Sequence, residues 1–525
     1  MSTPASTQIR LKHRIQMLLN SLNADLFEKA HIMRLALLSS LAGESIFLLG
    51  PPGVAKSMIA RRLKHAFTGA KSFEYLMGKF STPDEVFGPV SIKKLKEQDK
   101  YERLTEHYLP GAHIVFLDEI WKASPPIQNA LLTVLNEKVY RNGELEQKVD
   151  IRGLLAASNE LPVAGEGLEA IYDRFLIRVM VENIQQDGQF LQLLQVAGTK
   201  SNGLQISESI QISEQEYEQW DQAIGQIGVP SHVLSLILHL RKSIHVRNEG
   251  LELEDQLYVS DRRWVKITRL LKTSAFLNDL PEVHLIDLHL ASHCIWHRAD
   301  QIAEAKELVE AALAQYGYRG LVPIRAMEQE LSSLKEEILQ STQQVRQERV
   351  EVPKTYEDSR GEAYLRIPML WNRGAVFIRR ADFDKLGEQQ MFIPIFEQTA
   401  EGYRTFQRYG FSKVSPFELL AKDKQARIET EHIDQEKVDV LRPEANHLRL
   451  WNNQIDLLLE SCDRAIEMIQ AKKEQEEPLL TQHLFVDPAV APLILDNLDR
   501  LTNDLLNLKL DIQKTRHSYE SLGEH

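Results

Sequence analysis

The chain has 525 residues, which is too long for one hydrophobic core, so we expect about two to four domains. Its 43% hydrophobic and 26% charged residues are ordinary for a globular protein and exclude a fibrous or disordered chain. The formal net charge of −13 disfavours nucleic acid as the main ligand, because phosphate binding needs a basic surface.

The amino-acid sequence predicts neither a secretion signal nor a membrane-spanning segment. The first 20 residues contain no apolar core of a signal peptide, and no apolar run approaches the ~20 residues that span a bilayer. The cysteines Cys294 and Cys462 lie far apart and outside any C-x-x-C pattern, which favours a reducing compartment. The sequence therefore predicts a cytoplasmic protein.

The N-terminal region predicts a phosphate-binding loop. A helical pattern from Leu18 to Leu41 is followed by the apolar run Ser45–Leu49, which predicts a buried strand. A Gly/Pro turn and a helix then follow, and this order forms a phosphate cradle because backbone N–H groups and a helix N-terminus face the anion. The expected nucleotide-binding residues are Gly50-Pro51-Pro52-Gly53-Val54-Ala55-Lys56-Ser57.

Within this loop, we expect Lys56 to neutralise the β- and γ-phosphates and the Ser57 hydroxyl to bind Mg²⁺. Ala55 departs from the general pattern, which has glycine there. Since a Cβ is tolerated easily only at negative φ, we expect a negative φ at Ala55.

Three further apolar runs predict strands of a parallel α/β sheet: Ile114–Leu117, Leu154–Ala157 and Leu176–Val181. The first ends in Asp118-Glu119, 62 residues after Lys56. Asp118 is our candidate for the Mg²⁺ side of the site, and Glu119 is our candidate general base.

Polar residues after the later strands are candidate sensors. Asn159 ends the second of these strands, where it could orient the attacking water, although a turn-forming Asn is the alternative. Arg174 precedes the last strand and either pairs locally with Asp173 or reaches a neighbouring subunit's γ-phosphate as an arginine finger.

From Gln185 to about Gln315 amphipathic helical patterns dominate, which predicts an all-α lid. Ser260 is the expected N-cap of a lid helix. Arg262 is our first choice as a nucleotide sensor on that helix, and Arg263 is a second candidate for contact with the nucleotide. His289, His293 and His297 recur every four residues and could chelate a metal on a helix face, although packed or solvated histidines are commoner.

The C-terminal part predicts a helical arm interrupted by a β-rich module. Heptad seams occur at 324–338, 448–469 and 494–512, so three helices can bury their apolar stripes within one chain; an intermolecular coiled coil is the alternative. Between Tyr356 and Phe417 lie 12 aromatic residues and short β-like runs separated by turn residues. This module is a candidate docking head, although most of its aromatic residues are expected to fill its own core.

Taken together, these motifs resemble the AAA+ ATPases, and the early spacing resembles the MoxR branch. The matching motifs are Walker A at Gly50–Ser57, Walker B at Ile114–Glu119, sensor 1 at Asn159, the finger Arg174 and sensor 2 at Ser260-x-Arg262. That branch has an insertion within its second helix, here Lys79–Tyr108, and a hairpin before sensor 1, here Val139–Val149 with an Asn-Gly turn.

The resemblance implies ATP and Mg²⁺ as cofactors, ATP hydrolysis and a hexameric ring. It also implies a von Willebrand factor A-type partner protein and, through the β-rich module, docking onto inducible lysine decarboxylase in the stress response. A nucleotide-gated adaptor, a magnesium-chelatase-like subunit and a nucleic-acid motor remain alternatives.

The expected fold class is α/β, with an AAA+ P-loop module followed by a discontinuous triple-helical arm that carries a small β-rich domain. The expected divisions are an αβα core at 1–190, an all-α lid at 191–305, the first part of the arm at 306–350, the β-rich module at 351–435 and the remaining arm helices at 436–525.

Overall fold

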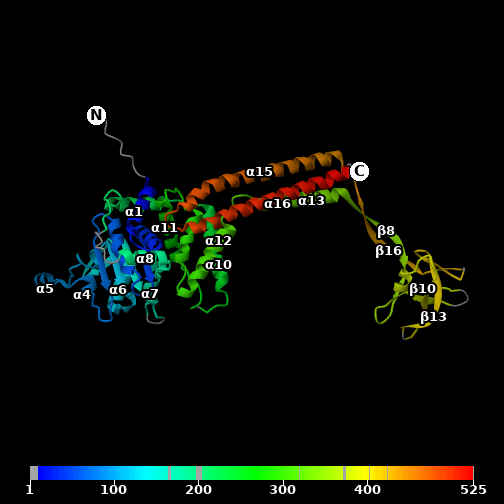
Figure 1. The fold of residues 1–525 in the computed structure, drawn as a ribbon, viewed down its shortest axis with the longest axis horizontal. Coiled ribbons are helices and arrows are strands. Elements are labelled where there is room, and N and C mark those ends of the chain that lie inside the picture. Colours follow the sequence, from blue (N-terminus) through cyan, green and yellow to red (C-terminus); the bar gives the residue numbers. More distant parts are fainter. Residues whose placement is uncertain are drawn as a thin grey trace, which may run out of the picture. The chain divides into compact units, whose positions relative to one another are not determined.

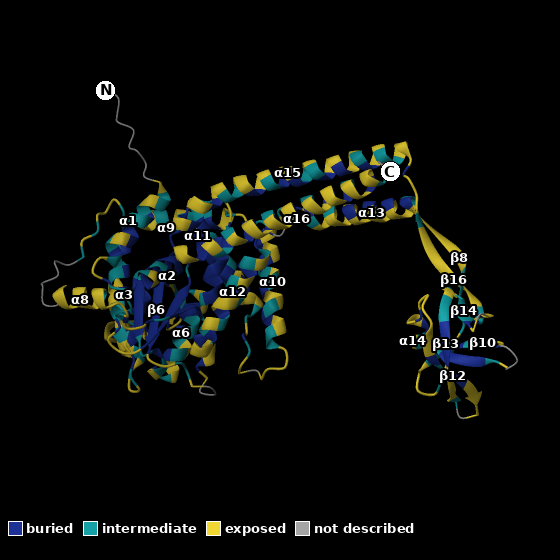
Figure 2. Ribbon diagram, turned by 45° about the vertical axis from the view of Figure 1, so that its right-hand side comes forward, coloured by how far each residue is buried: buried dark blue, intermediate teal, exposed yellow. Residues whose placement is uncertain are grey.

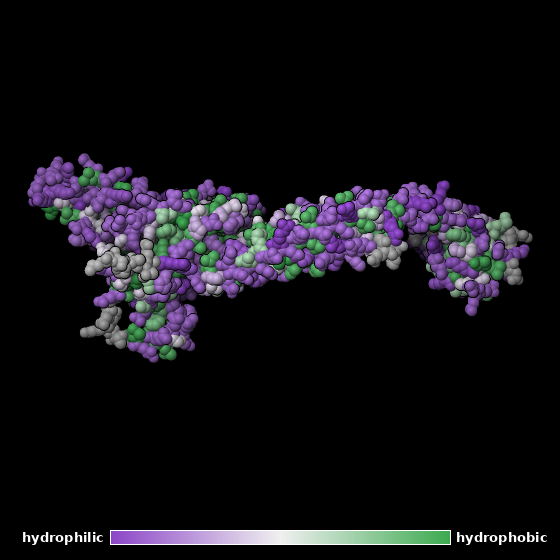
Figure 3. Space-filling view, turned by 90° about the horizontal axis from the view of Figure 1, so that it is seen from above, coloured by the Kyte–Doolittle hydropathy of each residue, from purple (hydrophilic) through white to green (hydrophobic). Residues whose placement is uncertain are grey.

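A computed structural model describes residues 10–163, 167–196, 204–252, 254–318, 320–370, 374–400, 402–422 and 424–523. The chain divides into two compact units, one of Met1–Ile324 with Ser461–Leu508 and one of Arg325–Glu460 with Lys509–His525. Figure 1 shows the elements of both units, and the surface drawn in Figure 3 is mostly polar. Among the helices of the described residues, none combines the length and apolar content needed to cross a bilayer.

The first unit is built around a parallel sheet, as predicted. Its five strands have the order β2-β3-β6-β1-β7. Their bounds are β1 (Ser45–Leu49), β2 (Ser72–Leu76), β3 (Ile114–Asp118), β6 (Gly153–Ser158) and β7 (Phe175–Met180). β1 and β6 are buried along their whole length because helices cover both faces of the sheet (Figure 2). The edge strand β2 escaped prediction, since its alternating exposure gives no continuous apolar run.

Helices flank this sheet. Those of the core are α1 (Leu11–Asn23), α2 (Ala30–Leu41), α3 (Lys56–Leu63), α6 (Pro125–Glu137) and α7 (Glu169–Tyr172), and α8 (Asp187–Val196), which has no buried residue, follows β7. The single helical run predicted from Leu18 to Leu41 is wrong, because the chain turns between α1 and α2. Asp25 and Glu28 have φ of 54° and 53° in that turn, a left-handed conformation that a helix does not contain.

The predicted insertion and hairpin lie together. The insertion carries α4 (Pro83–Phe87) and α5 (Ile92–Gln98), and the hairpin consists of β4 (Val139–Asn142) and β5 (Leu145–Lys148). The Asn142 side chain accepts a hydrogen bond from the Arg103 N–H at 2.6 Å and donates one to the Arg103 carbonyl at 3.0 Å. A Cβ on Gly143, whose φ is +66°, would lie 2.4 Å from the Tyr101 carbonyl oxygen. The hairpin turn is therefore bound closely to the insertion.

The lid is helical, as predicted. Its elements are α9 (Glu214–Gln226), α10 (Ser231–Asn248), α11 (Asp261–Leu277), the 3-10 helices η4 (Leu285–His293) and η5 (Ala299–Gln301), and α12 (Ile302–Tyr316). The metal-binding helix face suggested by His289, His293 and His297 does not form. A 3-10 helix has three residues per turn, so side chains four apart do not align, and His297 lies beyond the helix. Among the described residues, no group of three His, Cys, Asp or Glu side chains is arranged to hold a metal ion.

In the second unit, three helices pack within one chain. They are α13 (Ile324–Thr342), α15 (Ala445–Thr481) and α16 (Ala491–Gly523), of which α15 and α16 also extend into the first unit. Trp451 of α15 donates a hydrogen bond to Glu337 of α13 at 3.0 Å, and Lys335 of α13 pairs with Asp511 of α16 at 2.6 Å. Within this unit the seam residues Leu331, Leu334, Ile338, Trp451, Ile455, Leu458 and Ile512 are buried, which supports the intramolecular bundle over an intermolecular coiled coil.

The β-rich module is a seven-stranded antiparallel sheet in the order β15-β14-β13-β12-β11-β10-β9. Its elements are β9 (Thr355–Glu357), β10 (Ala363–Ile367), β11 (Val376–Arg379), α14 (Arg380–Asp384), β12 (Met391–Thr399), β13 (Gly402–Ser415), β14 (Glu418–Ala421) and β15 (Lys424–Arg427). Tyr364, Phe377 and Phe396 form a buried cluster, whereas Phe392 and Phe406 are exposed. An antiparallel ribbon of β8 (Gln343–Pro353) and β16 (Thr430–Val440) precedes and follows the module.

Candidate nucleotide site

The phosphate-binding loop follows β1, which lies between β6 and β7 in the sheet. Gly50 is required at the strand end, because a Cβ there would lie 2.1 Å from the Val181 carbonyl oxygen. Lys56 and Ser57 begin α3, so their N–H groups have no intrahelical acceptor. The loop thus presents free helix N-terminal donors beside a lysine, an arrangement that suits a phosphate group.

Ala55 does not have the negative φ that we expected. Its φ is +68° and its ψ is 21°, which is the left-handed region, and it caps the N-terminus of α3. The loop must reverse direction before the helix can begin, and this reversal decides the conformation in spite of the Cβ. An alanine in this conformation is strained by roughly 1 kcal/mol.

A chain of hydrogen bonds joins three of the predicted residues. Lys56 is 6% exposed, and its Nζ donates to the Gly50 and Pro51 carbonyls and, at 2.8 Å, to Asn159 Oδ1. The amide of Asn159 donates in turn to Glu119 Oε1 at 2.7 Å. Burial lowers the pKa of Lys56, and the nearby charges of Asp118 and Glu119 oppose this shift. The ends of β1, β3 and β6 therefore bring together a cation, an amide and a carboxylate.

The two carboxylates after β3 are held differently. Asp118 Oδ1 accepts a hydrogen bond from the Glu119 N–H at 3.0 Å. Glu119 has a φ of 54°, which turns the chain sharply after the strand, and its Oε2 lies 3.2 Å from Lys122 Nζ. The hydroxyl of Ser57 and the carboxylate of Asp118 are hard oxygen donors of the type that Mg²⁺ prefers. These two residues and Lys56 fit a Mg²⁺–triphosphate group.

Sequence reasoning missed Lys122, although its position three residues after Glu119 is visible in the sequence. Its ammonium and the Asn159 amide share the carboxylate, since Lys122 contacts Oε2 and Asn159 donates to Oε1. Both contacts hold the Glu119 carboxylate in a defined orientation at the end of β3.

Arg174 is separated from this group of contacts. Within the described residues, its guanidinium has no hydrogen-bond or ion-pair partner, and its Nε is buried without one. The local pair with Asp173 that the sequence left open is not formed, because Asp173 accepts from Arg263 at 3.3 Å. Arg174 is therefore available to a group that this chain does not itself provide.

The two lid arginines have different surroundings. Arg262 is exposed and donates to Asn136 Oδ1 of α6 at 3.2 Å. Arg263 is 3% exposed, and its guanidinium is bound to carbonyl groups of the chain itself. The nucleotide contact that we expected of Arg263 would require these bonds to break, whereas Arg262 keeps free donors.

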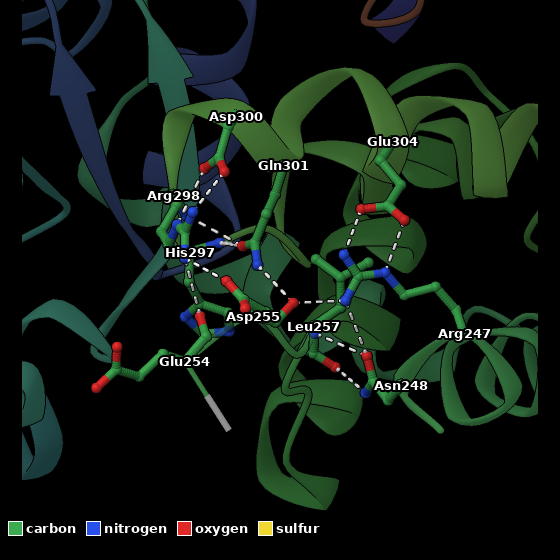
Figure 4. Close-up of polar contacts among 10 residues, drawn as sticks. All are labelled: Arg247, Asn248, Glu254, Asp255, Leu257, His297, Arg298, Asp300, Gln301 and Glu304. Carbon is green, nitrogen blue, oxygen red and sulfur yellow. Dashed lines mark hydrogen bonds and ion pairs between the residues drawn. The ribbon is translucent and has the colours of Figure 1, made fainter. Parts of the chain in front are cut away.

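A network of polar contacts holds the loop that leads to these arginines (Figure 4). Arg298 pairs with Asp255 at 2.6 Å, and Gln301 donates to the Asp255 carbonyl at 3.2 Å. His297 Nε2 lies 2.6 Å from the Tyr258 carbonyl, and Ser260 caps α11 by accepting from the Arg263 N–H. The start of α11 is consequently fixed to η5 and to the segment before it.

Two family models match the chain. A family model described as the MoxR domain of MoxR–vWA–β-propeller ternary systems matches residues 13–222, and a model of the AAA lid domain matches residues 232–309. A solved structure from Cytophaga hutchinsonii, described as a candidate ATPase, is 20% identical with a TM-score of 0.47 and covers 58% of this chain and 94% of its own.

Two uncharacterised proteins of Methanocaldococcus jannaschii are also similar. One is 34% identical over 57% of this chain and 74% of its own length, and the other is 35% identical over 53% and 70%. A structural protein of Acidianus two-tailed virus is 29% identical over 32% of this chain and 28% of its own. With both domain models matched in sequence and the site geometry in place, the chain belongs to the MoxR family of AAA+ ATPases.

Proposed function

We propose that the chain hydrolyses ATP with Mg²⁺ at the loop Gly50–Ser57 and uses the hydrolysis to remodel or regulate a partner protein. The observation that supports this most directly is the hydrogen-bonded chain from Lys56 through Asn159 to Glu119. Phosphoryl transfer to water requires mainly positioning and charge neutralisation, and these residues supply both.

Each residue has a separate role in this proposal. Lys56 exchanges its present carbonyl and amide acceptors for phosphate oxygens, while Ser57 and Asp118 hold the metal ion. Bound Mg²⁺ would neutralise charge on the phosphates. Glu119 accepts the proton of the attacking water, and Asn159, which already contacts it, orients that water. Arg262 senses the nucleotide from the lid.

The finger Arg174 requires a neighbouring protomer, since within the described residues its guanidinium has no partner. A head-to-tail interface that closes on itself produces a ring. We therefore propose a homo-oligomeric ring, hexameric by resemblance to the family, in which Arg174 of one protomer acts on the site of the next.

The partner proteins are proposed from the resemblance to known families. The matched family model is named for systems with a von Willebrand factor A protein, which supports a partner of that type. The split helical arm with an inserted β-rich module resembles the regulatory ATPase RavA, which implies docking of the module onto inducible lysine decarboxylase. Phe392 is an exposed apolar side chain on β12 of the module, which supports such docking.

The central experiment compares Lys56→Met with Glu119→Gln. Lys56→Met should weaken nucleotide binding at least about tenfold because the phosphates lose their main side-chain counter-charge. Glu119→Gln should bind ATP normally but lose hydrolysis. Binding is measured with a fluorescent nucleotide and hydrolysis by phosphate release. Normal hydrolysis in Glu119→Gln would refute the assigned base.

The alternative is a nucleotide-gated adaptor in which hydrolysis is incidental. Glu119→Gln separates the two, because a remodeller loses its effect on the partner and an adaptor keeps it. Docking is tested by removing residues 354–429 and joining the ribbon ends with an Asn-Gly turn, which is feasible because Pro353 and Thr430 are paired. Partner binding should disappear while ATPase activity remains; retained binding would place the docking surface elsewhere.

A further inference from the structure

Arg263 makes contacts that neither the nucleotide site nor a simple ion pair accounts for. Its Nε donates to the Cys294 carbonyl at 2.5 Å, and its Nη1 donates to Asp173, to the carbonyl at 3.1 Å and to the carboxylate at 3.3 Å. Its Nη2 donates to the carbonyls of Phe175 and Leu176 at 3.0 and 2.9 Å. All five guanidinium N–H donors are thus used within the protein.

The acceptors are available because β7 begins irregularly. Ser45 of β1 lies opposite Phe175, whereas Ile46 lies opposite Ile177, so Leu176 is an extra residue. Such a bulge leaves its residue outside the regular ladder and re-aims the neighbouring side chains. Arg263 satisfies the carbonyls of Phe175 and Leu176 and thereby holds this bulge in place.

These acceptors surround Arg174 in sequence, with Asp173 directly before it and Phe175 directly after it. A second lid contact reinforces the segment: the Tyr172 hydroxyl donates to the His297 carbonyl at 2.8 Å. The Arg174 backbone N–H donates to the Ile171 carbonyl at 3.0 Å, but within the described residues its guanidinium has no hydrogen-bond partner. The backbone on both sides of Arg174 is therefore fixed by the lid, while its side chain is left free.

We propose that Arg263 is a positioning residue that ties the first turn of α11 to the backbone on both sides of Arg174, so that the lid sets where the finger points. This inference rests on the proposed function, because it needs Arg174 to act on a neighbouring protomer. Arg262 lies on the same turn, so nucleotide sensed at Arg262 is transmitted through Arg263 to the finger.

A purely structural arginine would behave differently. Substituting such an arginine would lower the stability of its own protomer and would reduce hydrolysis at every site that needs this protomer to be folded. A positioning role predicts that the protomer with the substitution keeps a competent site and fails only as the donor of the finger. The two cases are separated by asking which site of an interface loses activity.

The test mixes two inactive variants. Arg263→Met keeps its own site but offers a misplaced finger, and Glu119→Gln has an inactive site but an intact finger. Alone, Arg263→Met should lose about 10- to 100-fold in kcat with less than about a twofold change in KM for ATP, since misplacement of an aligned group has that scale of effect. Random 1:1 mixing before assembly should restore activity at about one interface in four.

Two controls accompany the mixture. Arg174→Ala mixed with Glu119→Gln must also recover, and its failure would refute the finger in trans and hence the proposed ring mechanism. Arg152→Met removes another buried arginine of the first unit, which contacts Asp150 and not the segment around Arg174. Any activity that Arg152→Met loses should not return on mixing.

Recovery of Arg263→Met with Glu119→Gln supports the inference. No recovery, while Arg174→Ala does recover, overturns it. Thermal unfolding shows whether Arg263→Met is folded. If Arg263→Met is not folded, Arg263→Lys takes its place in the same mixture, because a lysine keeps the charge but cannot bind all of these carbonyls. A folded Arg263→Lys with wild-type kcat would also overturn the inference. A folded Arg263→Lys whose loss of kcat is not repaired by mixing would overturn it as well.

Discussion

Ala55→Gly should stabilise the nucleotide-binding unit, because glycine adopts the left-handed conformation of this helix cap without the penalty of a Cβ. Ala55 has a φ of +68°, where a Cβ costs roughly 1–2 kcal/mol relative to glycine. Glycine adds about 0.4–1 kcal/mol of chain entropy to the unfolded state, which acts in the opposite direction. The difference predicts a net gain of about 0–1.6 kcal/mol, with a midpoint of about 0.8 kcal/mol that corresponds to a rise of about 2–3 °C in Tm.

Calorimetry of the full chain measures this shift, and Ala60→Gly is the matched control. Ala60 lies within α3 and is buried, so the same substitution should destabilise by about 1–2 kcal/mol. Nucleotide affinity of Ala55→Gly should stay within about twofold, since the loop keeps its conformation. If both substitutions lowered Tm, the left-handed conformation at Ala55 would be refuted.

Two other substitutions test contacts of the first unit, one at the hairpin turn and one between α1 and α9. Gly143→Ala should detach the hairpin from the insertion, because its Cβ would collide with the Tyr101 carbonyl; faster hydrogen exchange near Tyr101 would show it, and unchanged exchange would contradict the contact. A hydrogen bond from Arg14 lowers the pKa of Glu216 to about 2, below the value of about 4.3 in the unfolded chain. This pair therefore stabilises the folded state fully above about pH 5, and its contribution is lost as the pH falls toward 2. The difference in unfolding free energy between wild type and Glu216→Gln, about 1 kcal/mol after solvent screening, should therefore shrink over that range; a constant difference would exclude the pair as its cause.

Much of the core could be predicted because its signals are local. The buried strands β1, β3 and β6 are continuous apolar runs, and each carries a functional residue just after its end. In a parallel sheet those ends lie on one edge, so the strand pattern alone is enough to expect that Lys56, Glu119 and Asn159 meet there. The heptad seams of the arm were equally readable, since their spacing alone places the apolar residues on one stripe.

Other features depend on contacts between residues far apart in sequence. The turn between α1 and α2 and the edge strand β2 give no clear periodic signal in the sequence. The β8–β16 ribbon pairs residues that lie from 77 positions (Pro353 and Thr430) to 97 positions (Gln343 and Val440) apart, and both of its faces are largely exposed, so no alternation of polar and apolar residues marks it.

The amino-acid sequence by itself determined the chemistry of the site, because the residue types and their place after buried strands are local properties. Only the tertiary structure decided how two adjacent arginines differ. Arg262 and Arg263 carry the same charge and follow one another in the first turn of α11, yet one is exposed and the other is buried among backbone carbonyls. The difference comes from the bulge at the start of β7, where the Phe175 and Leu176 carbonyls accept hydrogen bonds from Arg263.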